Sequence, residues 1–432
     1  MLWNINNRNS PSPIESRRFF NILTTCLAFQ TIGGSLLYTI FARKINTLGS
    51  GLDVFGFSAT AFSFAALVAA PIMGMVADRF GRRILLLSSL ISQTFAALGY
   101  LLASSGEIFI GIRAAAGALT AGLIPTTMSM IADMSPAKER GRWIGYVTGV
   151  SAIGYILGPA LGGSLYDRWG LEATFLTAMC FAFIAFTVAF TLIPETSKLS
   201  SRTATHPASG SIKTQSFSSL KYFKSFKNAI PRPYTTFLVL LVITFIAVFA
   251  WRFAEPPFHF YIYDDLGWTS ARFGLIIGGY AVLYMVAETF LGRLSDRHGR
   301  KPILIVGFIL HVAQYIALIT TRSTALIALG VAFSGLGEGL FMPALNAFYL
   351  DVTPDQYRAR VLGIKESVFS LAGLSGPSLV VLVSKYLTTQ GILIFSGSLI
   401  LLCAGIVPFM VKAKTSNEVL AEGKPEEGVS TS

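Results

Sequence analysis

One pattern occurs twice in this sequence, and it constrains the fold more than any other feature. The segment 74–83 reads GMVADRFGRR and the segment 292–301 reads GRLSDRHGRK, which puts the two copies at an offset of 218 in the numbering. The same offset relates other identical residues in an ungapped register: Gly117 and Gly335, Pro125 and Pro343, Asp133 and Asp351, Arg140 and Arg358, Gly158-Pro159 and Gly376-Pro377. The chain is therefore predicted to contain two copies of one structural unit.

Long apolar segments show where these two units fold. The chain is 53% hydrophobic and 13% charged, whereas soluble proteins carry about 25% charged residues. The segments 84–103, 173–193 and 391–411 contain no charge and have the length of about 20 residues that crosses a membrane. We expect nine further spans at 19–42, 57–77, 108–131, 143–165, 234–262, 273–291, 303–321, 324–350 and 361–384. This predicts an all-α membrane protein with twelve transmembrane helices arranged as two six-helix parallel repeats.

The basic residues predict the orientation of these spans. Of the 34 Lys and Arg residues, 25 fall in the termini and the even-numbered loops, and 6 fall in the odd-numbered loops. The positive-inside rule then places both termini in the cytoplasm. The predicted organisation is a cytoplasmic N-terminus (1–18), an N-terminal six-helix bundle (19–193), a cytoplasmic linker (194–233), a C-terminal six-helix bundle (234–411) and a cytoplasmic tail (412–432). The first 18 residues lack the apolar core of a signal peptide, so we expect the first span to stay in the mature protein.

Several classes of function are disfavoured. The basic residues flank membrane spans, whereas nucleic-acid binding needs them on one folded face. The cysteines Cys26, Cys180 and Cys403 lie in apolar spans without metal spacing. The sequence has no P-loop, no HExxH and no G-x-S-x-G. We therefore expect no enzyme activity, no cofactor, no metal and no nucleic-acid partner.

Each copy of the duplicated motif is predicted to be a short charged turn between two helices. Its aspartate, at the membrane surface, can accept hydrogen bonds from an arginine or a helix N-terminus, and could latch one conformation. Alternatively, the charges only fix topology; the presence of two copies in register favours the latch. The predicted gate residues are Gly74, Asp78, Arg79, Gly81 and Arg82, with Gly292, Asp296, Arg297, Gly299 and Arg300.

The fifth span carries a second pattern, a string of small residues. Gly154, Gly158, Pro159, Gly162 and Gly163 make one face of this helix nearly flat. Flat faces let membrane helices approach closely and pack by dispersion. The second copy keeps Gly376-Pro377 but has valines where the later glycines stood.

Together these patterns resemble the major facilitator superfamily of secondary transporters. The glycine string is similar to the span-5 motif of its drug:proton antiporter branch. The resemblance implies a major facilitator fold in which the loop between spans 2 and 3 is a conformational switch. It also implies two halves that alternately open a midplane site to either side. Arg113 heads R-A-A-A-G, similar to the family's R-x-x-x-G with Ala116 in place of Gln. The sequence departs from many members in span 1, which offers Gln30 and Tyr38 but no acid.

Ionisable residues inside membrane spans are costly and indicate functional sites. All the carboxylates within spans, Glu255, Glu288, Glu338 and Glu366, belong to the second half. Glu338 is expected near mid-depth and is the leading proton-carrier candidate. Glu255 could pair with Arg252 three residues earlier, and Glu288 and Glu366 are expected near the cytoplasmic boundary.

Two basic side chains complete the candidate pathway. Arg113 stays charged when buried and must meet a carboxylate, an anionic substrate or water, unless it snorkels to the interface. His259 could relay protons or be an interfacial side chain.

The leading hypothesis is a proton-coupled exporter of amphipathic or lipophilic small molecules, a monomer in the plasma membrane whose partners are substrate, protons and the lipid bilayer. An uptake symporter for an organic anion or metabolite is the alternative, and a membrane sensor that moves no solute is a third possibility. The linker segment 219–227, SLKYFKSFK, is either a simple connection or a stretch that binds anionic lipid.

Overall fold

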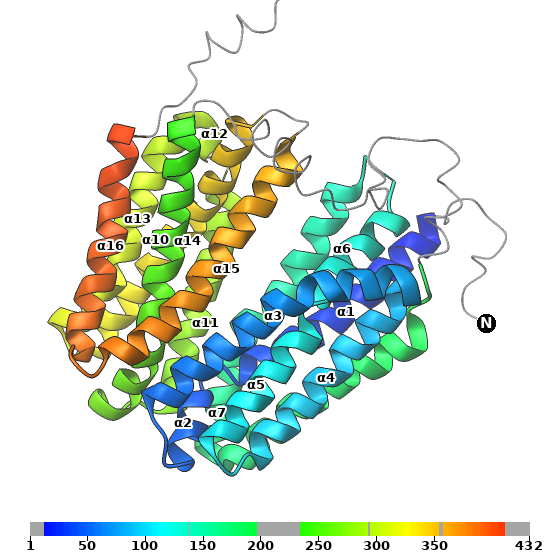
Figure 1. Ribbon diagram of the computed structural model, residues 1–432, viewed down its shortest axis with the longest axis horizontal. Coiled ribbons are helices and arrows are strands. Elements are labelled where there is room, and N and C mark those ends of the chain that lie inside the picture. The colour runs from blue at the N-terminus through cyan, green and yellow to red at the C-terminus, as the bar shows by residue number, and fades with distance from the viewer. Residues whose placement is uncertain (1–12, 137, 197–233, 293, 354–356, 411–432) are drawn as a thin grey trace, which may run out of the picture.

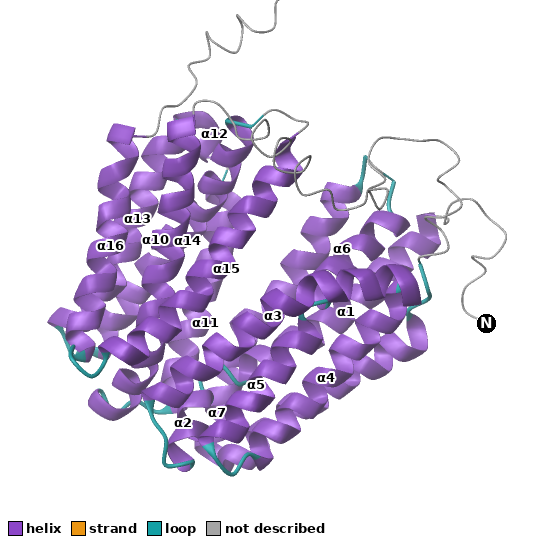
Figure 2. Cartoon of the chain, in the orientation of Figure 1, coloured by secondary structure: helices purple, strands orange, loops and turns teal. Residues whose placement is uncertain are grey.

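The described part of the chain is almost wholly helical. The computed structural model describes residues 13–136, 138–196, 234–292, 294–353 and 357–410. Within these ranges helices are joined by short loops and no strand occurs (Figure 2). Residues 197–233 of the predicted linker and the predicted tail 412–432 lie outside the described residues, so the predicted domain boundaries remain a proposal.

The helices of the first half are α1 (Pro13–Leu36), α2 (Phe41–Thr47), α3 (Leu52–Phe80), α4 (Arg82–Leu102), α5 (Gly106–Thr120), α6 (Leu123–Met134) and α7 (Arg140–Leu192). The second half contains α10 (Tyr234–Phe260), η2 (Tyr261–Asp265), α11 (Ser270–Val286), η3 (Ala287–Leu291), α12 (Leu294–His298), α13 (Arg300–Thr320), α14 (Thr324–Asp351), α15 (Arg358–Val383) and α16 (Thr389–Met410).

Eleven of the described helical segments are long and apolar enough to cross a membrane, and one of them is two spans. Helix α7 has 53 residues, which at 1.5 Å per residue would extend about 80 Å, far beyond a hydrocarbon core of about 30 Å. Gly170 divides it, because its φ of 80° and ψ of −171° are not helical and its positive φ favours glycine. The twelve predicted spans are therefore present.

Two predicted spans are interrupted. The first, expected as one helix over 19–42, is shared between α1 and α2, with a turn over 37–40. This break frees the carbonyl of Thr39, which accepts a hydrogen bond from the hydroxyl of Tyr263. The fourth, expected over 108–131, is divided between α5 and α6 at Ala121 and Gly122.

The predicted duplication is visible in the contacts. A Cβ added to Gly117 would overlap the carbonyl oxygen of Phe62, and one added to Gly335 would lie 2.6 Å from that of Tyr280. The offset of 218 relates both members of the second pair to those of the first. Equivalent glycines thus let equivalent helices touch, α5 with α3 and α14 with α11.

The two halves form separate groups of helices that meet near one end of the molecule (Figure 1). Contacts between the groups are made by α7 with α11 and by α3 with α10 and α15. The groups diverge toward the end that carries the turns at Gly81 and Gly299, which we term the motif end. The other end, which includes Gly170, we term the Gly170 end.

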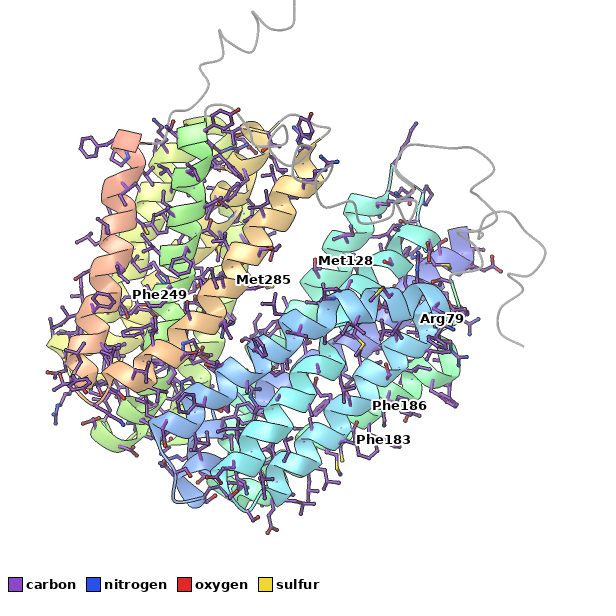
Figure 3. All side chains as sticks on the ribbon, viewed as in Figure 1. Arg79, Met128, Phe183, Phe186, Phe249 and Met285 are labelled. Atoms are coloured by element: carbon purple, nitrogen blue, oxygen red, sulfur yellow. The ribbon has the colours of Figure 1, made fainter. Side chains whose placement is uncertain are left out.

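The outer surface is apolar, as a membrane requires. Large side chains such as Phe95 and Phe290 are 65% and 71% exposed. Figure 3 shows Phe183 and Phe186 of α7 on the outer side of the first group. Because so much exposed apolar area is unusual for a soluble monomer and the spans are long enough, the protein is an integral membrane protein.

One edge of the predicted glycine string packs against α1. A Cβ at Gly158 would overlap the Ser35 hydroxyl, and one at Gly162 would overlap the carbonyl oxygen of Leu36. At Gly154 a Cβ would overlap the side chain of Thr31. The close approach also permits a hydrogen bond of 2.6 Å from the Ser35 hydroxyl to the carbonyl of Gly154.

The neighbouring edge of the same helix packs against α11 of the other group. A Cβ at Gly163 would overlap the carbonyl oxygen of Ser270. In return, one at Gly274 of α11 would overlap the carbonyl oxygen of Pro159. The glycine string therefore serves both the packing within the first group and the junction between the groups.

Replacing Gly158 by Leu should destabilise the protein, because a large side chain cannot occupy a contact between backbones and overpacking costs about 1–3 kcal/mol or more. We expect a lowered unfolding temperature of the purified protein. The matched control is Gly149→Leu on the same helix, where an added Cβ meets nothing within 4 Å. Equal behaviour of the two variants would contradict the packing role.

Candidate functional site

The first copy of the motif forms a tight turn held by an acid from outside the motif. Gly81 has a φ of 99°, which favours glycine, and α4 starts at the next residue. The backbone N–H groups of Arg82 and Arg83 donate to the carboxylate of Glu195, each at 3.1 Å. An anion is favourable at a helix N-terminus, so Glu195 stabilises the start of α4. Sequence reasoning missed this role, although Glu195 is the single acid in 194–233.

In each motif copy, the arginine that follows the turn glycine pairs with an aspartate at the end of the next span. Arg82 forms an ion pair with Asp133 of α6, and Arg300 forms one of 2.8 Å with Asp351 of α14. The two pairs are related by the offset of 218. Asp133 and Asp351 were recognised as repeated residues, but their partners were not predicted.

Asp296 pairs with Arg300 at 2.5 Å, within its own turn, whereas the side chain of Asp78 lies outside the described residues.

The remaining gate residues lie around the two turns. Arg79 is exposed at the motif end (Figure 3), and Arg297 is also exposed. Gly299 repeats the turn of Gly81 with a φ of 87°. A Cβ at Gly292 would lie 2.7 Å from the carbonyl oxygen of Glu288, while one at Gly74 would meet nothing within 4 Å.

At the Gly170 end, polar contacts join the two groups. The carboxylate of Asp167, in α7, accepts from the backbone N–H groups of Ser270 and Ala271 at 3.1 and 2.7 Å. These are the first residues of α11, so the acid caps a helix of the other group. Arg43 of α2 donates to the carbonyl of Trp268 at 3.0 Å and lies 3.9 Å from the ring centroid of Tyr263.

Several predicted pathway residues lie on α10 or in contact with it. Arg252 and Glu255 form an ion pair of 2.9 Å, the pairing that their spacing suggested. The ring of Tyr38 lies 4.8 Å from that of His259. His259 is fully buried, and its Nδ1 lies 2.9 Å from the carbonyl of Glu255.

Glu338 lies in the middle of α14 and is half-buried. Two glycines beside it fix this helix. A Cβ at Gly337 would lie 2.5 Å from the carbonyl oxygen of Gly307, and one at Gly339 would overlap that of Tyr284. The carboxyl group is therefore carried by the middle of a tightly packed helix.

The other predicted polar residues have different surroundings. The amide of Gln30 donates to Oε1 of Gln93 at 2.8 Å. Glu366 is exposed and pairs with Lys365 at 2.8 Å. Glu288 is exposed within η3. Arg113 lines a cavity of about 180 Å³ inside the first group, whereas the cluster on α10 belongs to the second group.

Comparison with known proteins shows what class of protein this arrangement defines. The family model described as Major Facilitator Superfamily matches residues 19–254 and 240–431. The chain belongs to this superfamily of membrane transporters.

Relatives confirm the resemblance to the drug:proton antiporter branch. Multidrug resistance protein 2 of Bacillus subtilis is 24% identical over 368 residues, covering 84% of this chain and 88% of the relative. Multidrug resistance protein MdtG of Salmonella arizonae is 28% identical over 406 residues, covering 90% and 96%. The class B tetracycline resistance protein of Escherichia coli is 27% identical over 363 residues, covering 81% and 84%.

Solved structures share the fold. The nucleoside transporter NupG superposes with a TM-score of 0.72 at 13% identity, covering 92% of this chain and all of NupG. The human organic anion transporter MFSD10 has a TM-score of 0.64 at 19% identity, covering 92% and 100%.

Replacing Asp167 by Asn should loosen the Gly170 end, because the amide keeps one acceptor and loses the charge on the α11 N-terminus. At an exposed site this interaction is worth about 0.3–1 kcal/mol, so the separated population should rise about two- to fivefold. The measurement is the distance distribution between spin labels on cysteines at Arg168 and Arg272, with the exposed native Cys180 replaced by Ser. Glu172→Gln removes a nearby exposed acid and is the control; an unchanged distribution for Asp167→Asn would disprove the contribution.

Proposed function

We propose that this protein exports amphipathic or lipophilic small molecules in exchange for protons. The observation that carries the coupling is Glu338, a half-buried carboxyl group in the middle of a membrane helix. Burial disfavours a charged carboxylate, so this group can take up and release a proton as it becomes accessible in turn from either side of the membrane.

The direction of transport rests on the relatives. Those described above are named as multidrug or tetracycline resistance proteins, which favours export over the uptake of an organic anion or metabolite. We place the motif end and both termini in the cytoplasm, in keeping with the charge distribution. In this orientation the groups diverge toward the cytoplasm, the side from which an exporter loads.

Different residues then act at the two ends. The contacts of Asp167 and Arg43 close the outer end in this conformation. The turns at Gly81 and Gly299, each with an arginine paired to an acid, hold the rims of the cytoplasmic opening. We further propose that the protein works as a monomer, without cofactor, metal, nucleic acid or catalytic residues.

Replacing Glu338 by Gln should uncouple transport from the proton gradient, because the amide cannot carry a proton. Proteoliposomes with an imposed pH gradient are assayed for tetracycline. The variant should lose uphill accumulation but keep exchange at zero gradient.

The matched control is Glu366→Gln, which removes an exposed carboxyl group from a neighbouring helix and should leave uphill transport intact. If Glu338→Gln still accumulates substrate at the parental rate, Glu338 is not the carrier.

A further inference from the structure

The first group of helices contains a cavity that is not lined by Glu338, the residue proposed to carry the proton. This cavity of about 180 Å³ is lined by α1, α2, α3, α4, α5 and α7. All the described residues that line it belong to the first half, so it lies within one group and not at the junction of the two. Its polar and aromatic lining residues include Phe41, Phe62, Gln93, Tyr100 and Arg113.

The duplication explains why the space is open. In the second half, a buried polar network occupies the positions that correspond, at the offset of 218, to residues lining this cavity. His311 Nδ1 lies 2.8 Å from the Ser334 hydroxyl, and the Gln314 amide lies 3.4 Å from His311 Nε2. The positions equivalent to Ser334 and Gln314 are Ala116 and Ala96, which both line the cavity. Two alanines thus leave empty the volume that the second half fills.

The first half also places a charge at this space. Arg113 stands where the second half has Val331. Among the described residues, no carboxylate lies within 4.0 Å of its guanidinium nitrogens, and its buried Nε has no hydrogen-bond partner. The aromatic rings of Phe62 and Phe41 lie 4.6 and 4.9 Å from its Cζ. Cation–π contacts contribute about 0.5–2 kcal/mol and do not neutralise a charge inside a membrane.

A second hydrogen-bond donor faces the same space. Gln93 lines the cavity, and its Oε1 already accepts a hydrogen bond from Gln30. Its remaining polar group is the NH₂, which lies against Gly34, where an added Cβ would come within 2.6 Å. The cavity therefore combines a fixed cation, an amide donor and aromatic walls, which is the chemistry that recognises a carboxylate or sulfonate on an aromatic or aliphatic body.

We propose that this cavity binds the anionic head group of an amphipathic substrate, with the guanidinium of Arg113 as its counter-charge. The inference rests on the proposed function and narrows its substrate class to amphiphilic anions. The space is smaller than the roughly 300–1,000 Å³ of sites that enclose a drug-sized ligand. It accordingly takes the head group, while the apolar body lies outside it.

Binding to the purified full-length protein tests this without a proton gradient. The probes are p-butylbenzoate, its uncharged methyl ester and the cation p-butylbenzylammonium, compared by titration calorimetry. The parent should bind the anion at least about tenfold more tightly than the other two, a difference of about 1.4 kcal/mol. Arg113→Gln should lower affinity for the anion by at least about tenfold and change affinity for the ester less than about twofold.

Three further variants make the result specific. Arg113→Lys should retain part of the affinity, because an ammonium keeps the charge but loses the bidentate geometry. Ala96→Gln places the residue of the second half into the space and should weaken anion binding with the arginine intact. Arg142→Gln removes an exposed arginine elsewhere and should change nothing. The unfolding temperature of each variant shows whether it folds. If Arg113→Gln does not fold, the affinities of Ala96→Gln and Arg113→Lys for the anion decide whether the proposal holds.

The proposal is overturned if the ester or the cation binds as tightly as the anion, or if folded Arg113 and Ala96 variants keep parental affinity for it. Failure of the proposed function is a separate result. Uphill export of tetracycline with no preference for the anion would retain proton-coupled export and reject the subsite. Arg113-dependent binding of the anion without uphill transport of any probe would retain the subsite and reject the coupling.

Discussion

Close contact between helix backbones is the constraint on which the rest of the structure depends. Lipid is as apolar as a leucine side chain, so membrane helices associate through packing and need small residues where they cross. Here glycines meet carbonyl oxygens at crossings in both halves, as at Gly117 and Gly335. The string from Gly154 to Gly163 continues this packing across the junction of the two groups. The positions of Glu338 and Arg113 are therefore set by helices that have little freedom to shift individually.

Charged side chains make their contacts mainly at the two ends of the helix groups. Polar contacts join the groups at the Gly170 end, where Asp167 caps α11, while the motif arginines pair within their own groups. The two ends thus differ in kind: one set of contacts crosses between groups and the other does not. A rocking motion of the two rigid groups against one another would break the first set without disturbing the second.

Much of the fold could be predicted because membrane spans depend on composition and length. The charge-free segments, the motif turns and the offset of 218 are visible in the letters, and the structure contains all of them. The interruptions at 37–40 and at Gly122 were not predictable, since hydropathy is the same for a continuous and a broken helix. The partners of the motif residues were not predictable either, because Glu195 and Asp133 contact the first motif turn from distant segments of the chain. The cavity beside Arg113 was not predictable because it depends on which faces of six helices converge. The pairing of Arg252 with Glu255 was accessible because it lies within one helix turn.

The open space of the first half and the buried network of the second half lie at equivalent positions of the two copies. Thr120 lines the cavity in the first half, and its equivalent at the offset of 218 is Glu338. At this position one copy thus has a hydroxyl group that lines an open space, and the other has a carboxyl group beside a filled one. Equivalent helices keep their glycine contacts in both halves, so the two copies can differ at one position, an open space against an ionisable side chain, without a change in the packing of either.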